Sequence, residues 1–396
     1  MLLGGLRYLL PVIEAAHRHG IHVITVDYLP DNIAHRYSDE YHNVSIIDKE
    51  AILALAQELQ IDGIMSFAVD PGVVAAAYTA EVMGLPFQCS YEAACILQDK
   101  SRFRKFLADN GFNVPNARGY SEADDALKDI DYFNWPVIVK PVDSAGSKGV
   151  TRVDDSKDLP AAIAHALECS PSRHFIIEDF LELEGYQSST DVFTVDGELL
   201  HCPFSDQLFD KSAVNPYVPA IEIWPSTMPQ RAQNELRSEL QRLFKSLNCK
   251  TGIYNVEARL CKNGKAYIME VSPRGGGNRI AELQRYATGV DLIEAEMLKA
   301  LDLPVEQVKD ANLTDYWVNY ILHSNTGGMF KEIRYTDGFK DACVVEEGIL
   351  AKVGDMIQPF TGANQSLGTI FLRFDTREQL DRFVASPSTY ITIVTE

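Results

Sequence analysis

Apolar runs and helical periods alternate along the N-terminal part of the chain. The short apolar runs are typical of buried strands, and the segments between them have the spacing of amphipathic helices. Gly20 and Gly84 follow two of these segments, and glycine commonly ends a helix. Because strands separated by helices form parallel sheets, we expect a parallel α/β unit here. The expected strands are residues 2–3, 21–28 and 61–67, and the expected helices end at 19 or span 50–60 and 71–83.

The hydrophobic pattern changes twice more along the chain. A smaller α/β unit has strands at 136–140 and 175–181, and long strands with two helices, 231–247 and 292–301, follow it. After residue 313 short strands are separated by glycines, which predicts a β-rich C-terminal unit. The fold class is therefore α/β with α+β lobes. The expected domains are residues 1–98, 99–190, 191–305 and 306–396.

Composition restricts the possible partners. The formal net charge of −20 disfavours nucleic acid and anionic membranes as partners, and no apolar run reaches membrane-spanning length. The N-terminal segment has no basic leader and reads as the start of a domain rather than as a signal peptide. Seven scattered cysteines without a Cys-x-x-Cys pair indicate reduced thiols and a cytoplasmic protein.

The turn after residue 140 is a candidate anion site. The strand ending at Lys140 runs into Asp-Ser-Ala-Gly146-Ser147-Lys148-Gly149 and then into a second strand. Backbone N–H groups at such a bend can form a nest for an anion, and Lys140 can reach the same anion. A glycine hairpin with two exposed lysines is the alternative. A helix is expected over 99–111, with Asp99 as a plausible N-cap. Lys100, near its start, is either solvated or balanced by an anion, because a cation is disfavoured there.

A hairpin places two carboxylates opposite each other. Asn263-Gly264 between two alternating runs predicts a two-residue turn, and pairing partners then sum to 527. Glu257 faces Glu270, and Asn255 faces Ser272. Carboxylates placed this way repel unless one is protonated or a cation lies between them, and Mg²⁺ (or Mn²⁺) suits such oxygen ligands. Alternatively the glutamates are solvated, or they pair separately with Arg259 and Arg274.

The same register sorts the hairpin residues between two faces. Tyr254, Val256, Ala258, Leu260, Tyr267 and Met269 would form a core face, and Ile268 would lie on the face of the two glutamates.

A lysine at a strand end, a glycine nest and a carboxylate hairpin, in this order, resemble the ATP-grasp superfamily, in particular biotin carboxylase, carbamoyl-phosphate synthase and the L-amino-acid ligases. The resemblance implies ATP between two α+β lobes and phosphoryl transfer to a small carboxylate, whose acyl phosphate an amine attacks. It also implies ATP and Mg²⁺ as cofactors, small carboxylates and amines as substrates, and a possible homodimer. Alternatives are carboxylation through carboxyphosphate and nucleotide binding without turnover.

The resemblance also implies roles for individual residues. Lys100, Lys140 and the loop Gly146, Ser147 and Gly149 would contact the phosphates, and Arg274 would steady the transferred group. Glu178, Asp179, Phe180 and Leu181 would meet adenine, and Glu184 or Gln187 would meet the ribose. Glu257 and Glu270 would bind the metal. Ser272 replaces the family's usual asparagine, so we expect Asn255 to supply part of the missing amide oxygen.

The acceptor side is encoded less clearly. In the segment 206–225, Glu222 could meet an amine and Lys211 a carboxylate. The alternative for both is a surface loop with ordinary charges.

Overall fold

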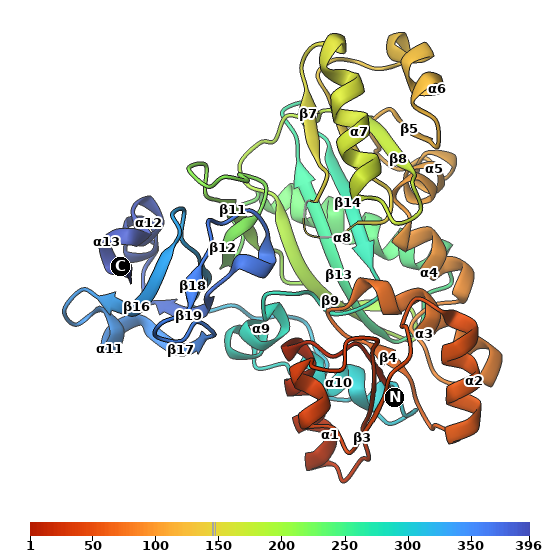
Figure 1. Ribbon diagram of the computed structural model, residues 1–396, viewed down its shortest axis with the longest axis horizontal. Helices are drawn as coiled ribbons and strands as arrows, with labels where there is room; N and C mark the ends of the chain where they lie inside the picture. The colour runs from red at the N-terminus through yellow and green to blue at the C-terminus, as the bar shows by residue number, and fades with distance from the viewer. Residues whose placement is uncertain (145, 147) are drawn as a thin grey trace.

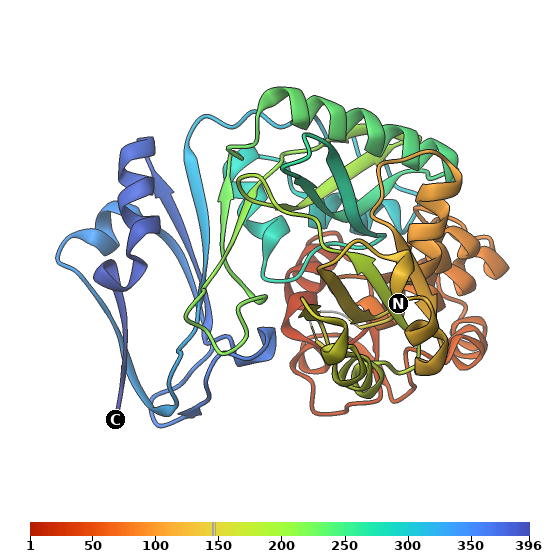
Figure 2. The same cartoon turned by 90° about the horizontal axis from the view of Figure 1, so that it is seen from above.

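The computed structural model describes residues 1–144, 146 and 148–396. Among these residues the strands form five sheets (Figure 1). Three of the sheets lie next to one another, and the C-terminal segment lies to one side of them (Figures 1 and 2).

The N-terminal sheet is parallel, as the alternating pattern predicts, with the order β3-β2-β1-β4. The strand expected at 2–3 is confirmed, the strands expected at 21–28 and 61–67 are shorter in the structure, and the strand at 40–42 was not predicted. The helices match their expected spans within about one turn. Apolar residues flanking these short strands, such as Val23, Ile64 and Phe67, are buried without being in the ladder. The elements are β1 (Leu2–Leu3), α1 (Leu10–Arg18), β2 (Ile24–Val26), β3 (Glu40–His42), α2 (Lys49–Leu59), β4 (Met65–Ser66) and α3 (Asp70–Met83).

A small antiparallel sheet with the order β5-β8-β6-β7 forms the next lobe. The helix α7 covers one of its faces and buries Leu159, Ile163 and Ala166 against it. Two helices, α4 and α5, connect this lobe to the N-terminal sheet. The elements are α4 (Tyr91–Gln98), α5 (Lys100–Asp109), β5 (Ala117–Tyr120), α6 (Ala123–Lys128), β6 (Val137–Pro141), β7 (Thr151–Val153), α7 (Leu159–Cys169) and β8 (Phe175–Asp179).

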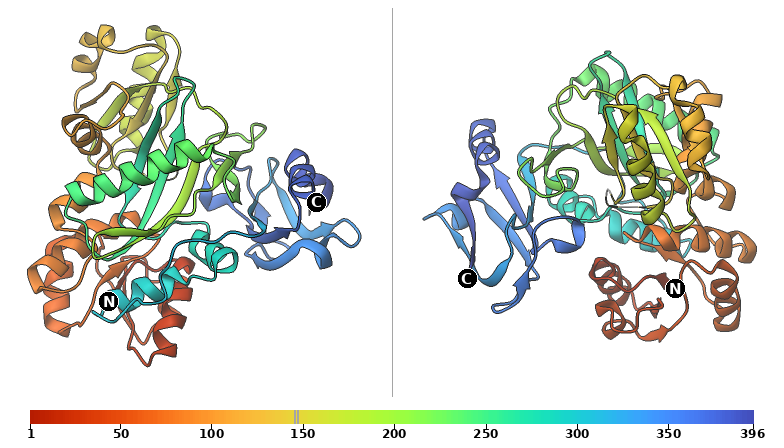
Figure 3. Two further views of the ribbon diagram at one scale, coloured as in Figure 1. Left: turned by 180° about the vertical axis from the view of Figure 1, so that it is seen from behind. Right: turned by 45° about the horizontal axis from the view of Figure 1, so that its top comes forward.

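The central sheet is antiparallel with the order β10-β9-β13-β14. One face is covered by α8, which crosses it in the view from behind (Figure 3). Leu236, Leu240 and Leu243 recur at helical spacing and lie in the largest apolar core, so the other face of the sheet is left for polar side chains. The elements are β9 (Ser188–Val195), β10 (Glu198–His201), α8 (Gln230–Ser246), β13 (Gly252–Leu260) and β14 (Ala266–Ser272).

The C-terminal segment is β-rich, as expected. Its strands form one sheet of order β11-β12-β15-β19-β17, in which β11 and β12 come from earlier in the chain, and another of order β18-β16-β20. Its helices and α9 were not predicted from the sequence, although α12 begins with a capping box between Thr376 and Gln379 that could have revealed it. The elements are β11 (Asp206–Phe209), β12 (Pro219–Trp224), α9 (Ile280–Thr288), α10 (Leu292–Lys299), β15 (Tyr316–Leu322), β16 (Gly328–Tyr335), α11 (Phe339–Cys343), β17 (Val344–Ile349), β18 (Met356–Ile357), β19 (Gly368–Phe374), α12 (Arg377–Ala385), α13 (Pro387–Tyr390) and β20 (Ile391–Thr395).

Shortening a side chain between α8 and the central sheet will destabilise the fold. Leu240 is fully buried, so Leu240→Ala leaves a cavity and should lower the free energy of unfolding by about 2–5 kcal/mol. The melting temperature, followed by circular dichroism, should fall clearly. Leu303→Ala is the control, because Leu303 is 43% exposed, and its melting temperature should stay close to that of the parent. Equal melting temperatures for the two variants would contradict this packing.

Candidate active site between the lobes

The hairpin of β13 and β14 brings two carboxylates face to face. Glu257 pairs with Glu270 in the register of the ladder, and Asn255 pairs with Ser272, so both predicted pairs are confirmed. The alternative in which Arg259 and Arg274 neutralise the two glutamates is not what the structure shows, because Arg259 donates to Gln187 and Arg274 binds Asp70.

The turn itself differs from the prediction, and a second irregularity compensates for the difference. The Cys261 N–H donates to the Lys265 carbonyl, so the loop holds three residues rather than two, with Gly264 in the left-handed region at φ 76°. The register shifts again between Glu257 and Ala258, where Met269 is the extra residue on β14. The two shifts cancel, which explains why the carboxylates still meet.

The bulge reverses the expected faces near the turn. Ile268 lies in the main core with Ala258, whereas Tyr267 and Met269 pack on the opposite side against Leu181. The prediction that Tyr267 and Met269 face the core, and that Ile268 faces the glutamates, is wrong. One inserted residue on β14 inverts the direction of the β14 side chains between it and the turn, relative to the predicted register.

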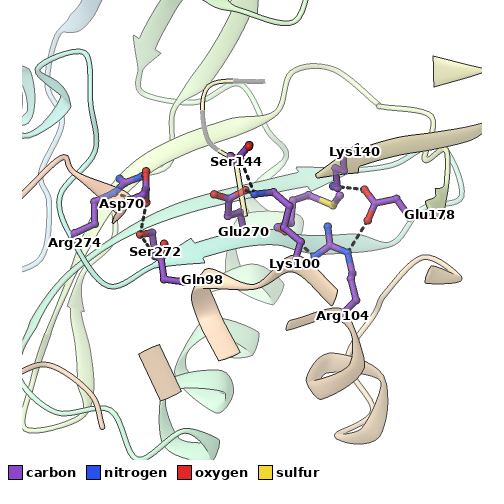
Figure 4. A network of polar contacts seen from close by, with 11 residues as sticks. Asp70, Gln98, Lys100, Arg104, Lys140, Ser144, Glu178, Glu270, Ser272 and Arg274 are labelled. Atoms are coloured by element: carbon purple, nitrogen blue, oxygen red, sulfur yellow. Dashed lines mark hydrogen bonds and ion pairs between the residues drawn. The ribbon is translucent and has the colours of Figure 1, made fainter. Parts of the chain in front are cut away.

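Lys100 supplies a cation beside the carboxylate pair. Its ammonium group lies 3.5 Å from Glu270 Oε2 and 3.1 Å from the Ser144 carbonyl oxygen (Figure 4). Asp99 caps the helix α5, as predicted, and this cap fixes the start of the helix at Lys100. Burial disfavours the charge of Lys100, but the nearby carboxylates outweigh burial and raise its pKa. Burial, together with the charge of Glu270, raises the pKa of Glu257.

A buried ionic triad lies at the other end of this row of polar side chains (Figure 4). Glu178 Oε1 accepts from Lys140, and Oε2 accepts from Arg104 Nε at 2.9 Å (Figure 4). A second nitrogen of Arg104 donates to the carbonyl of the bulged Met269 at 2.7 Å. Burial would raise the pKa of Glu178, but the two cations outweigh it and lower the pKa to about 2. Burial lowers the pKa of Lys140, although Glu178 opposes this effect.

Asp70 joins the N-terminal unit to the residues after β14. Its two oxygens accept from Arg274 Nε and from a terminal nitrogen of Arg274 at 2.8 and 2.7 Å, and the Ser272 hydroxyl donates to Oδ1 at 2.9 Å. The same hydroxyl accepts from Gln98 at 2.6 Å. Burial opposes ionisation of Asp70, but the charge of Arg274 outweighs it and lowers the pKa of Asp70.

The glycine turn lies between β6 and β7, as expected. Gly146 and Gly149 both have positive φ, 68° and 71°, which glycine adopts without strain. Ser147 lies outside the described residues. The Lys140 ammonium group points toward Glu178 at the foot of this turn (Figure 4).

The segment after β8 is partly committed to internal contacts. The Asp179 carboxylate accepts from Asn116 and Asn134, and the Phe180 N–H donates to the Pro136 carbonyl. Of the two ribose candidates, Glu184 is exposed.

Gln187, the second ribose candidate, is held in a hydrogen-bonded row. Its oxygen accepts from Arg259 at 2.8 Å, and its amide donates to Gln207 at 2.6 Å. The row continues to Glu222, which accepts from Gln207 at 3.3 Å and from Asn319 at 3.1 Å. This ribose candidate is therefore part of an internal hydrogen-bonded network.

Two further carboxylates, Asp191 and Glu222, are buried near the Glu257–Glu270 pair. Burial raises the pKa of Asp191 to about 6, although hydrogen bonds from Asn255 and from the Gly276 N–H oppose this shift. Burial, together with the charges of Asp191 and Glu257, raises the pKa of Glu222 to about 8. Glu222 is 1% exposed, so its reading as a surface charge is wrong, whereas Lys211 is exposed in a loop.

Sequence reasoning missed four residues of this region. Asp70, Gln98, Arg104 and Asp191 come from four different elements. Asp70 meets Arg274 across 204 positions, and Arg104 meets Met269 across 165. No local pattern marks such contacts, although Asp70 stands before Pro71 at the start of a predicted helix, and a charge there could have been noted.

Comparison with known proteins identifies a domain within the chain. Residues 133–282 match the family model of the ATP-grasp domain, and the sheets described above form the ATP-grasp fold. The chain therefore carries an ATP-grasp domain, and members of this family are ATP-dependent ligases.

Individual relatives agree with this assignment. The chain is 27% identical over 221 residues, 55% of its length, to the large chain of carbamoyl phosphate synthase from Thermoanaerobacter sp. (strain X514), and it spans only about a fifth of that relative (20%). The L-amino acid ligase from Bacillus licheniformis superposes with a TM-score of 0.82 at 20% identity, covering 100% of this chain and 98% of the ligase.

A third similar structure holds ligands. The biotin carboxylase domain dimer of Hydrogenobacter thermophilus 2-oxoglutarate carboxylase, in complex with MgADP, ADP and bicarbonate, has a TM-score of 0.71 at 17% identity. The match covers 100% of this chain and 91% of that domain. At this level of identity the likeness shows the fold alone.

Two searches of the described residues add limits. They contain no group of three or more His, Cys, Asp or Glu side chains arranged around a metal position. In the same part of the chain, no helix is both long and apolar enough to cross a membrane.

The buried triad makes stability depend on Glu178. Its pKa is lower in the folded protein than the usual 4.5, so its contribution is complete above pH 4.5 and is lost as pH falls toward about 2. Glu178→Gln leaves two buried cations unpaired and should lower the free energy of unfolding near neutral pH by about 3 kcal/mol. Thermal melts of the variant should lose part of the acid dependence that the parent shows. Glu306→Gln, at an exposed position, should melt like the parent at every pH. Parent-like melts of Glu178→Gln would contradict the triad.

Proposed function

We propose that the protein is an ATP-dependent carboxylate–amine ligase that requires Mg²⁺ and acts through an acyl phosphate. The observation that carries the proposal is the Glu257–Glu270 pair, with the Lys100 ammonium group already lying 3.5 Å from Glu270. Such a pair is costly unless positive charge lies next to it, and a phosphate chain with its metal supplies that combination of charges.

The donor set fits a hard divalent cation. Glu257 and Glu270 offer carboxylate oxygens on one face of the sheet, and Mg²⁺ usually binds one or two carboxylates with water and substrate phosphates. Bound there, it would neutralise charge on the phosphates during transfer. Asn255 uses its nitrogen toward Asp191 at 3.0 Å, so its oxygen remains available to the same cation. Ser272 already exchanges hydrogen bonds with Asp70 and Gln98, which makes it the weaker candidate ligand.

The chain's own cations would hold the nucleotide. Lys100, Lys140 and Arg274 lie along one line of polar groups (Figure 4) and would bind its phosphates. Arg274, fixed by Asp70, would steady the transferred phosphoryl group. The segment Glu178–Leu181 would meet adenine, with the Met269 and Tyr267 side chains on the same side as Leu181.

A substrate screen tests the proposal. The purified protein is incubated with ATP, Mg²⁺ and pairs of small carboxylates and amines, and ADP and phosphate release is measured. At least one pair should give ADP release that depends on both partners. Release that needs bicarbonate instead would indicate carboxylation, and tight ATP binding with no release under any condition would indicate a binding protein.

Removing one charge of the metal pair should abolish turnover and preserve the fold. Glu270→Gln keeps the size of the side chain but lowers the affinity of the site for Mg²⁺, so ADP release should fall at least about a hundredfold. Glu332→Gln, on an exposed strand of the C-terminal sheet, should retain parent activity. Full activity of Glu270→Gln, at unchanged Mg²⁺ dependence, would exclude this metal site.

A further inference from the structure

Three buried side chains near the Glu257–Glu270 pair present oxygen atoms that have no positively charged partner in the described part of the chain. We call Asp191, Glu222 and Asn319 the oxygen cluster. All three are 1% exposed or less. Glu222 and Asn319 are direct cross-strand neighbours on β12 and β15, and Asn319 donates to Glu222 at 3.1 Å.

One short loop ties the cluster together. The Gly276 N–H donates to Asp191 Oδ1 at 2.7 Å, and two residues later the Asn278 carbonyl accepts from Asn319 at 2.6 Å. This loop begins at Arg274, the proposed phosphate clamp. The oxygen cluster and the proposed phosphate clamp are therefore joined by the same loop.

Two oxygens of the cluster lack any hydrogen-bond donor. Asp191 Oδ2 and Asn319 Oδ1 are both buried and unpartnered among the described residues. The orientation of Asn319 follows from its neighbours, because Nδ2 faces two acceptors, the Glu222 carboxylate and the Asn278 carbonyl. Its oxygen must therefore point the other way. Buried acceptors without donors cost free energy, so an excess of them indicates a ligand that donates.

The excess of hydrogen-bond acceptors in the oxygen cluster indicates what kind of ligand would bind there. The partners that the two carboxylates do have are neutral amides, namely Gln207, Asn255, Asn319 and a backbone N–H. A ligand here should therefore carry positive charge and several N–H donors. A primary ammonium group has three such donors and one charge.

The space around the loop differs between two neighbouring glycines. A Cβ atom added at Gly277 would meet no atom within 4 Å, whereas one added at Gly276 would lie 3.0 Å from Asp191 Oδ1. The loop is thus close-packed on the side of the cluster and open one residue further on.

We propose that the oxygen cluster binds the ammonium group of the amine acceptor. Asp191 Oδ2 and Asn319 Oδ1 would accept hydrogen bonds from its N–H groups. This proposal rests on the ligase function proposed above and names the class of its second substrate: a primary amine that arrives as a cation. Quaternary amines and neutral nucleophiles would gain nothing from the cluster. Asp191 and Asn319 thereby set specificity, while the phosphate and metal groups remain responsible for transfer.

Direct binding gives a test that needs no knowledge of the reaction. Thermal melts are recorded with increasing methylammonium chloride, and with tetramethylammonium chloride at equal ionic strength as the control. Methylammonium should raise the melting temperature of the parent above that of the control. Asp191→Asn, which has nearly the same shape, and Asn319→Leu should each lose this difference. An equal response to the two salts in the parent would overturn the proposal.

Kinetics separates the cluster from the transfer step. With a carboxylate identified by the screen, hydroxylamine, mostly uncharged near neutral pH, traps the acyl phosphate as a hydroxamate. Asp191→Asn should form hydroxamate at the parent rate, while its KM for the amine rises at least about tenfold. The KM for ATP should not change. Equal losses in the hydroxylamine and amine reactions would show that Asp191 is structural.

The two proposals can fail separately. If the parent forms no hydroxamate with any carboxylate, the ligase function fails, and the methylammonium melts still decide whether the cluster binds ammonium. If hydroxamate forms but Asp191→Asn and Glu222→Gln keep the parent KM for the amine, the ligase function stands and the oxygen cluster is refuted.

Discussion

Two carboxylates held opposite each other on adjacent strands are the constraint around which the candidate site is organised. Glu257 and Glu270 cannot move apart, because the ladder of β13 and β14 fixes their backbones. Their repulsion is relieved either by protonation of one carboxylate or by positive charge, and Lys100 at the start of α5 lies 3.5 Å from Glu270. Arg274 carries further positive charge close by, although Asp70 holds it at present. The arrangement alternates negative and positive charge, which is what the proposed metal–phosphate complex requires.

The same constraint links the parts of the chain. Lys100 comes from a helix beside the small lobe, the two glutamates from the central sheet, and Asp70 from the N-terminal unit. Arg104 binds both Glu178 in the small lobe and the Met269 carbonyl in the central sheet. That carbonyl is free to accept because the bulge takes Met269 out of the regular ladder. A single extra residue therefore positions the carboxylates, turns Met269 toward Leu181 and anchors a helix of the small lobe.

The local pattern of the sequence was sufficient for most of the fold. Period and spacing predicted the parallel N-terminal sheet, the helix that Asp99 caps, and the pairing of Glu257 with Glu270. That pairing was obtained from a two-residue turn that does not exist, and it holds only because the bulge cancels the error. Pairings nearer the turn, such as that of Ala258, were accordingly wrong. The contacts of Asp70, Arg104 and Asp191 are long-range, and their partners were fixed only once the sheets had packed.

The central claim is that Glu257 and Glu270 bind a metal that holds the phosphates of ATP. A crystal structure with a non-hydrolysable ATP analogue and Mn²⁺ tests it most directly, because Mn²⁺ can be located by anomalous scattering. The account predicts an anomalous peak in contact with carboxylate oxygens of both glutamates, with phosphate oxygens completing its coordination and Lys100 displaced toward the phosphates. A bound nucleotide with no Mn²⁺ at these glutamates, or with Mn²⁺ held elsewhere, would contradict it.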